Sequence, residues 1–194
     1  MIIFGYPGIG KTTCYEEHKD MYIDLDSYMF DKNIKNGWIP TYFKLAETFS
    51  ELGRDVFVST HQEVIDYFID HSKQRLVLIY PDEDLIFDWI DRLYYRYKMT
   101  ELESDKKAYN RVFRNYLIDV KAFDRLDKKD NLYRIKLNSK DYILNDVIQK
   151  FKININRKEI LEKQEVTVED VQETLRSLSN KINKLKRVLN KSQE

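Results

Sequence analysis

The chain has 194 residues, of which 42% are hydrophobic and 34% carry a charged side chain. Its 33 basic and 33 acidic side chains cancel to a net charge of zero, which disfavours bulk nucleic-acid binding and charge-driven membrane binding. No apolar run approaches the roughly 20 residues of a membrane span.

Cys14 is the only cysteine, so an internal disulfide is excluded and a reducing compartment is favoured. The N-terminus lacks the pattern of a signal peptide. We therefore expect a cytoplasmic protein with no membrane partner, built from one α/β domain and an appendage.

The start of the chain holds its most specific motif. The apolar run 2–4 precedes Gly5-Tyr6-Pro7-Gly8-Ile9-Gly10-Lys11-Thr12, which fits G-x-x-x-x-G-K-[ST] at every fixed position. Glycines let such a loop curl, so that its N–H groups and the N-terminus of the next helix face an anion. Lys11 would reach the β- and γ-phosphates of a nucleoside triphosphate, and the Thr12 hydroxyl would ligate Mg²⁺. We therefore predict that this loop binds ATP with Mg²⁺.

Hydrophobic patterning then alternates between strands and helices. Apolar runs predict strands at 2–4, 21–27, 55–61, 75–80 and 132–137. Amphipathic spacing predicts helices at 12–19, 41–52, 63–72, 82–97, 108–123 and 142–151. This alternation favours parallel pairing through right-handed crossovers, and hence a doubly wound sheet with helices on both faces.

Two acids lie at the end of the second predicted strand. In doubly wound sheets the ligand lies beyond the carboxyl ends of the strands. Because strand side chains alternate, Asp24 and Asp26 should point the same way. One could hold the Mg²⁺ shell through water, and the other could accept a proton from an attacking hydroxyl or bind a substrate hydroxyl. The alternative is a pair of solvated turn acids before Ser27.

The helices on either side of the charged segment 98–107 carry four arginines, Arg92, Arg96, Arg111 and Arg114. Arg92 and Arg96 are four residues apart and share a helix face. Arginine suits the clamping of a transferring phosphoryl group. We therefore predict a lid at about 97–125 that excludes water from phosphoryl transfer. The alternative is a salt-bridged helix surface, because Asp88 and Arg92 form an i,i+4 pair.

Other residues near the predicted strand ends give weaker signals. Trp38, Tyr42 and Tyr80 could stack on a base, although such aromatic residues more often belong to a core. His61, which ends the third predicted strand, could contact substrate, but a single histidine indicates little.

The predicted tail, 153–194, differs from the domain at 1–152. Its apolar residues follow steps of three and four, at Val168, Val171, Leu175, Leu178, Ile182, Leu185 and Leu189. This is the a/d seam of a coiled coil, which buries little without a partner. The alternatives are a homodimer through residues 161–189 and docking on the same chain. The polar character of the other faces favours self-association.

Several segments together resemble the nucleoside and nucleotide kinase family of P-loop proteins. They are residues 5–13, 23–27, 53–61, 80–81 and 89–93. More narrowly, they are similar to small ATP-binding proteins of bacteriophages described as nucleotide kinases. The resemblance covers about residues 1–150 and implies a five-stranded parallel sheet in the order 2-3-1-4-5, with a lid that bears arginines.

The resemblance also implies roles for individual residues. Residues 5–13, Thr13 included, would bind ATP, with Lys11 on the phosphates and Thr12 on the metal. Asp24 would handle metal or acceptor, and Arg92 and Arg96 would be lid-side arginines. One departure is Ser59, which stands where many P-loop ATPases carry a metal-binding aspartate. This departure weakens a motor-type or AAA-type ATPase assignment and moves the metal role to Asp24.

Three functions remain open from the sequence. The first is a phosphotransferase that moves the ATP γ-phosphoryl to a nucleoside, a nucleotide or a similar small acceptor. The second is a nucleotide-gated switch that engages a protein partner through its C-terminal helix. The third is a kinase of nucleic-acid 5′ ends, which needs only end recognition. A kinase requires an acceptor pocket, which we expect to be built from residues 24–42 and 80–96.

Overall fold

The computed structural model describes residues 1–32, 37–126, 131–160, 172 and 176. The chain divides into two compact units, Met1–Leu144 and Asn145–Glu194. The strands of the first unit are β1 (Ile2–Gly5), β2 (Tyr22–Asp24), β3 (Asp55–Val58), β4 (Leu76–Pro81) and β5 (Leu132–Leu137). Its α-helices are α1 (Lys11–Glu17), α2 (Ile39–Glu51), α3 (Gln62–His71), α4 (Ile86–Thr100) and α5 (Glu103–Arg125). Two 3₁₀ turns, η1 (Ser27–Met29) and η2 (Glu83–Leu85), complete it.

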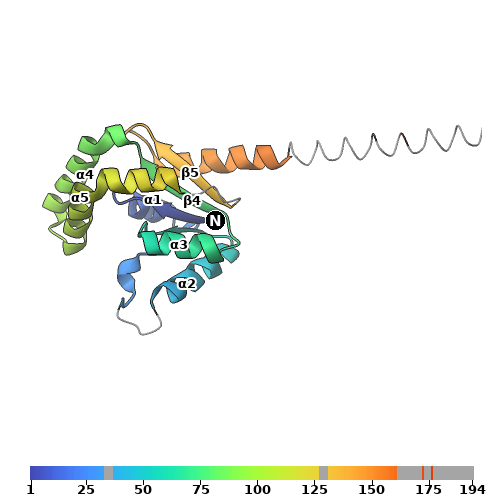
Figure 1. Cartoon of the computed structure of the whole chain (residues 1–194), viewed down its shortest axis with the longest axis horizontal. Helices are drawn as coiled ribbons and strands as arrows, with labels where there is room; N and C mark the ends of the chain where they lie inside the picture. Colours follow the sequence, from blue (N-terminus) through green and yellow to red (C-terminus); the bar gives the residue numbers. More distant parts are fainter. Residues whose placement is uncertain (33–36, 127–130, 161–171, 173–175, 177–194) are drawn as a thin grey trace, which may run out of the picture. The chain divides into compact units, whose positions relative to one another are not determined.

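The strands form one parallel sheet in the order β2-β3-β1-β4-β5, which confirms the predicted fold class (Figure 1). Every residue of β1, β3 and β4 is buried, as their continuous apolar runs predict. From β1 the chain goes first to β2 and β3 on one side and then to β4 and β5 on the other. The loop after β1 therefore leaves the sheet at its topological switch point, where ligands bind in such folds.

Helices cover both faces of the sheet (Figure 1). On one face, Phe4 meets Phe68 of α3 edge-on at a centroid distance of 5.5 Å, and Tyr6 meets Tyr116 of α5 at 5.9 Å. The opposite face carries Asp24, at the end of β2, and lies against α1. Because side chains alternate along a strand, Asp24, which pairs with Phe57, lies on the face opposite Phe4, which pairs with Val58.

The second predicted strand is shorter than its apolar pattern suggests. It ends at Asp24, because the Asp26 carboxylate accepts a hydrogen bond from the Tyr28 amide at 3.0 Å and starts the turn η1. Asp26 is thus the N-cap of a turn and is not a strand residue. Strand alternation therefore does not fix where Asp26 points, although the charges of both acids reach Lys11.

The charged segment 98–107 belongs almost entirely to helices. α4 runs to Thr100 and α5 begins at Glu103, so that only two residues connect them. Glu101 adopts the left-handed conformation with φ of 54°, which ends α4. The Thr100 hydroxyl donates to Asp105 at 2.6 Å and ties the two helix ends together. A lid formed by this region would be a helical hairpin, because the polar segment is not a loop.

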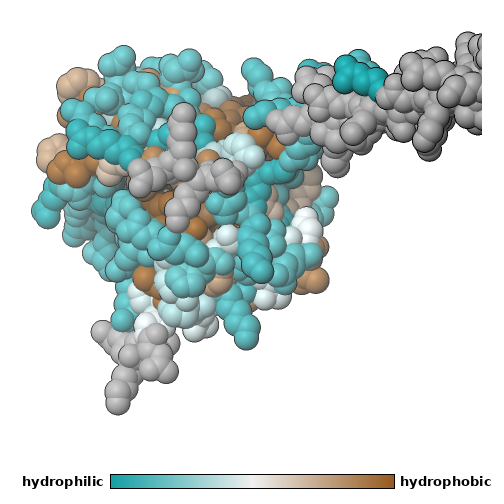
Figure 2. Space-filling view, turned by 45° about the vertical axis from the view of Figure 1, so that its right-hand side comes forward, coloured by the Kyte–Doolittle hydropathy of each residue, from teal (hydrophilic) through white to brown (hydrophobic). Residues whose placement is uncertain are grey.

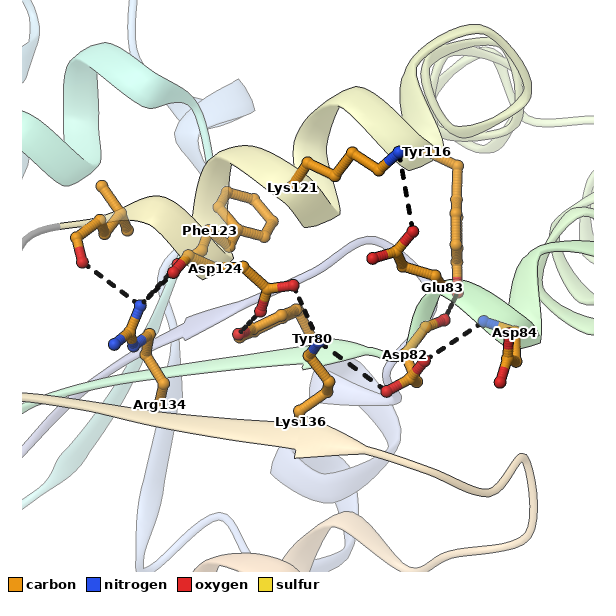
Figure 3. Close-up of polar contacts among 11 residues, drawn as sticks. Tyr80, Asp82, Glu83, Asp84, Tyr116, Lys121, Phe123, Asp124, Arg134 and Lys136 are labelled. Carbon is orange, nitrogen blue, oxygen red and sulfur yellow. Dashed lines mark hydrogen bonds and ion pairs between the residues drawn. The ribbon is translucent and has the colours of Figure 1, made fainter.

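A polar cluster fixes the end of α5 to β4 and β5 (Figure 3). Asp124 accepts from the Tyr80 hydroxyl at 2.6 Å and from Lys136 at 2.8 Å. Burial raises the pKa of Asp124, but these two hydrogen bonds outweigh it and hold the pKa below its usual value. Arg134 donates to the backbone carbonyls of Phe123, Asp124 and Leu126. The C-terminal end of α5 is therefore anchored to the sheet.

Hydrophilic side chains dominate the face seen in Figure 2, and hydrophobic ones gather in separate patches. Large exposed hydrophobic residues are frequent on α4, the connection and α5, at Phe87, Tyr94, Tyr95, Met99, Leu102, Phe113, Leu117 and Ile118. None of the helices in the described part of the chain combines the length and apolar character needed to cross a membrane.

The predicted closing helix at 142–151 is present as a helix at 144–160. Within the second unit, the Gln149 amide donates to Asn145, four residues earlier, at 3.4 Å. The predicted coiled coil and the predicted homodimer contact at 161–189 lie outside the described residues, except for Gln172 and Arg176.

Candidate functional site

The loop after β1 has the curled backbone that its glycines predict. Gly8 and Gly10 adopt φ values of +87° and +90°, in the left-handed region that favours glycine. The Tyr6 amide donates to Ile79 of β4 at 3.1 Å, and the Ile9 amide donates back to Tyr6 at 3.2 Å. Within the described ranges, the amides of Gly8 and Gly10 have no hydrogen-bond partner. Together with the first-turn amides of α1, they leave a group of donors available for an anion.

Lys11 lies across the start of this loop. Its ammonium donates to the Gly5 carbonyl at 2.9 Å. A Cβ atom on Gly5 would lie 2.6 Å from Lys11 Cδ, so only glycine leaves room for the lysine side chain. Burial lowers the pKa of Lys11, while the charges of Asp24 and Asp26 raise it. The two acids are therefore close enough to act on the ammonium.

Thr12 and Asp24 form the direct contact between loop and strand. The Thr12 hydroxyl donates to Asp24 Oδ2 at 2.8 Å. Burial raises the pKa of Asp24, although Lys11 and the Thr12 hydrogen bond oppose that shift. The hydroxyl and carboxylate predicted to surround the metal are thus adjacent, whereas one Asp26 oxygen is engaged by its own turn.

The available donors, one hydroxyl and one carboxylate, suit Mg²⁺ better than a metal that needs three or more protein ligands. No group of three or more His, Cys, Asp or Glu side chains in the described ranges could hold a metal ion. Mg²⁺ usually binds through one or two carboxylates and completes its shell with water and substrate phosphates. Thr12 contributes a hydroxyl oxygen and Asp24 a carboxylate, and both lie beside the loop amides.

The two arginines predicted to clamp a phosphoryl group differ in their surroundings. Arg96 pairs with Asp105 at 2.9 Å, its side chain is 42% exposed, and its charge reaches Lys11. Arg92 donates to the Gly8 carbonyl at 3.3 Å and to the Lys140 carbonyl at 2.7 Å. Arg92 therefore lies against the loop backbone, and its contact with a phosphoryl group stays a prediction.

A charged pair on α5 reaches the end of β3. Arg111 donates to the Thr60 carbonyl at 2.8 Å and pairs with Asp119 at 3.2 Å. Burial raises the pKa of Asp119, and Arg111 opposes this. The positive charge of Arg111 also reaches Lys11. Asp119 was not predicted, because an acid in an amphipathic helix resembles a solvated surface residue.

The residues after β3 present polar atoms near Arg111. The side-chain hydroxyls of Ser59 and Thr60 are buried, and they have no hydrogen-bond partner in the part of the chain that the structure describes. Burial lowers the pKa of His61 to about 4, and the charges of Arg111 and Lys32 contribute. His61 is therefore neutral at physiological pH and can donate or accept through its ring nitrogens.

The aromatic residues considered for base stacking belong to the core. Trp38, Tyr42 and Tyr80 are all buried. The Tyr42 hydroxyl donates to the Leu25 carbonyl at 2.7 Å and accepts from the Ser59 amide at 2.9 Å, so it joins the ends of β2 and β3. Two other aromatic residues, Trp89 and Tyr142, bond the loop, and the sequence analysis predicted no such contact for either.

No protein-family model matches the chain, and no curated protein matches it. Among solved structures, a shikimate kinase from Bacteroides thetaiotaomicron is similar, with 14% identity over 80% of this chain and 96% of that chain and a TM-score of 0.46. An uncharacterized protein from Eubacterium ventriosum is 13% identical over 79% of this chain and 95% of that chain, with a TM-score of 0.41. Identities this low say nothing about substrate, and they give no support to a bacteriophage origin.

Proposed function

We propose that the protein is an ATP-dependent phosphotransferase that uses Mg²⁺ and moves the γ-phosphoryl group to a small acceptor. The observation that carries this proposal is that three sets of chemical groups lie together at the carboxyl ends of β1 and β2. The amides of Gly8 and Gly10, the Lys11 ammonium and the Thr12–Asp24 pair lie around the N-terminus of α1. Phosphoryl transfer needs mainly positioning and charge neutralisation, and these groups supply both.

The loop residues 5–13 would hold the triphosphate. Lys11 bonds the Gly5 carbonyl, which is a partner it can exchange for β- and γ-phosphate oxygens. Thr12 and Asp24 would hold Mg²⁺, with Asp26 as a second acid beside them. When bound, Mg²⁺ neutralises the charge that develops on the phosphate oxygens.

The acceptor would approach from the ends of β2 and β3. Asp24 or Asp26 would orient the acceptor hydroxyl and receive its proton. Arg96 and Arg111 place positive charge near Lys11, where it would stabilise the transferring group. The buried Ser59 and Thr60 hydroxyls offer further hydrogen bonds to an acceptor. A nucleoside or a nucleotide, with several hydroxyl and amide groups, fits such a polar surface.

The deciding experiment is a transfer assay with ATP labelled at the γ-phosphate. Nucleosides, nucleoside monophosphates and 5′-hydroxyl oligonucleotides are offered separately with Mg²⁺. Label on a nucleoside or nucleotide supports the proposal, whereas label only on oligonucleotides indicates a kinase of nucleic-acid ends. Release of label to water alone, with every acceptor, contradicts the proposal and favours a nucleotide-gated switch.

A further inference from the structure

Three side chains bond three consecutive carbonyls of the phosphate-binding loop. Trp89 Nε1 donates to the Pro7 carbonyl at 2.7 Å. Arg92 Nη1 donates to the Gly8 carbonyl at 3.3 Å. The Tyr142 hydroxyl donates to the Ile9 carbonyl at 3.1 Å. We call Trp89, Arg92 and Tyr142 the carbonyl clamp.

The members of the carbonyl clamp also bond one another. Arg92 donates to the Tyr142 hydroxyl at 3.2 Å, and that hydroxyl donates onward to the loop. The Trp89 and Tyr142 rings are nearly parallel, with an interplanar angle of 5° and centroids 6.3 Å apart. Arg92 Cζ lies 4.5 Å from the centre of the Trp89 ring. The clamp is thus one connected unit that joins α4 to the segment after β5.

The clamp leaves little space behind the loop. Trp89 and Leu93 of α4 are fully buried. A Cβ atom on Gly8 would lie 3.1 Å from Trp89 Nε1 and 3.3 Å from Leu93 Cδ2. A side chain at Gly8 would therefore crowd Trp89 and Leu93.

Because the peptide bond is planar, a side chain that holds a loop carbonyl also orients the amide of the next residue. In a planar trans peptide the C=O and N–H groups point in opposite directions. The Pro7 carbonyl shares a peptide with the Gly8 amide, and the Ile9 carbonyl shares one with the Gly10 amide. Anchoring these carbonyls toward α4 and Tyr142 therefore turns both amides the other way.

We propose that Trp89, Arg92 and Tyr142 are positioning residues that hold the Gly8 and Gly10 amides toward the triphosphate before it binds. This inference rests on the proposed function, because it assigns the anion-binding role to that loop. Donors that are already oriented cost less ordering when the ligand arrives, and so increase affinity. The Tyr142 hydroxyl can donate at neutral pH as an ordinary tyrosine does, and burial raises its pKa further.

The first test measures amide hydrogen exchange in the ligand-free protein, for peptides covering residues 5–12. Tyr142→Phe removes one hydroxyl and keeps the ring, and Trp89→Phe removes the indole donor. Each variant loses about one hydrogen bond that holds the loop closed, so exchange of the bonded Tyr6 and Ile9 amides should become about fivefold faster. Tyr95→Phe, the same change at an exposed tyrosine of α4, should leave loop exchange unchanged.

The second test measures the dissociation constant for Mg·ATP by calorimetry on the same proteins. We expect Tyr142→Phe and Trp89→Phe each to weaken binding about fivefold, and Tyr95→Phe to bind as the wild type does. A merely structural role would lower the melting temperature without this loss of affinity. Circular dichroism at the assay temperature verifies that each variant is folded.

The two measurements distinguish a failure of the carbonyl clamp from a failure of the proposed function. Faster loop exchange together with weaker Mg·ATP binding supports the carbonyl clamp. Wild-type exchange in both variants overturns it, as does faster exchange without any change in affinity. If the wild type itself binds no Mg·ATP, the proposed function fails, whereas loop exchange still shows whether the clamp orders the loop.

Discussion

The Thr12 hydroxyl donates to Asp24 Oδ2 at 2.8 Å, and this contact joins the first turn of α1 to the end of β2. It places a neutral oxygen and a carboxylate side by side at the switch point of the sheet. The charged carboxylate is destabilised in this position, because burial raises the pKa of Asp24. A buried acid with a raised pKa next to an anion-binding loop is typical of a functional site.

Asp24→Asn should stop phosphoryl transfer while ATP still binds. A positioned acid or base contributes on the order of 100-fold to the rate or more, so we expect at least that loss. The variant should also melt at a higher temperature at pH 7. A raised carboxyl pKa means that the folded protein loses stability as the pH rises from the unfolded to the folded pKa, and asparagine removes this cost.

Transfer of label from ATP, calorimetry and thermal unfolding check the three parts of this prediction. Asp20→Asn, at an exposed acid between α1 and β2, is the matched control and should change none of them. Full transfer activity in Asp24→Asn would move the acceptor and metal roles to another residue.

Lys11→Ala should lose Mg·ATP binding. The ammonium would make charge-assisted contacts with the phosphates, and loss of such contacts should weaken binding by at least about tenfold. Stability should not fall, because burial lowers the Lys11 pKa and its charge is costly in the folded protein. Calorimetry and thermal unfolding measure both effects. Lys73→Ala changes an exposed lysine and serves as the control. An unchanged affinity for Mg·ATP in Lys11→Ala would refute the assignment of the loop as the phosphate-binding site.

His61 should make the protein sensitive to acid. Its pKa is about 4 in the folded protein and about 6.5 when unfolded, so the unfolded chain takes up the proton first as the pH falls. Stability is therefore lost between about pH 6.5 and pH 4. The imidazole is only half-buried, so we expect an effect of about 1 kcal/mol, or roughly 2–4 °C in melting temperature.

His61→Gln should reduce the fall in melting temperature between pH 7 and pH 5 by that amount. Thermal unfolding across this range measures it. Equal pH dependence in wild type and His61→Gln would show that His61 carries no such cost.

The sheet was predictable because its strands have the apolar runs that buried parallel strands require. The runs at β3 and β4 are continuous and bounded by turn residues, so alternation with helices gave the fold class. The strand order came from the resemblance and is confirmed by the structure. The loop was predictable residue by residue, because each position of its motif has a separate physical reason.

The contacts around the loop were harder to predict, because periodicity gives the face of a helix but not its neighbour. Arg92 and Arg96 share one helix, yet Arg92 bonds the loop backbone and Arg96 pairs with Asp105. Asp26 looked like a strand residue, but an aspartate can equally cap a turn. Tyr142 had no sequence signal, because its contact with Ile9 spans 133 residues of chain.

Arg111 and Asp119 should stabilise the protein as a coupled pair. Their side chains are 23% and 19% exposed, and Arg111 also bonds the Thr60 carbonyl at 2.8 Å. Arg111→Gln leaves a half-buried acid and a carbonyl without their partner, so we expect it to lower the free energy of unfolding by about 2 kcal/mol. Arg114→Gln, on the exposed side of α5, should change it by less than about 0.5 kcal/mol.

A double-mutant cycle with Asp119→Asn isolates the contact between the two side chains. Urea unfolding of the wild type, Arg111→Gln, Asp119→Asn and the double variant should give a coupling energy of about 1 kcal/mol. The double variant should lose less stability than the sum of the two single variants, because either substitution alone already breaks the ion pair. Additive effects of the two substitutions would mean that Asp119 does not help to orient the Arg111 guanidinium near Lys11.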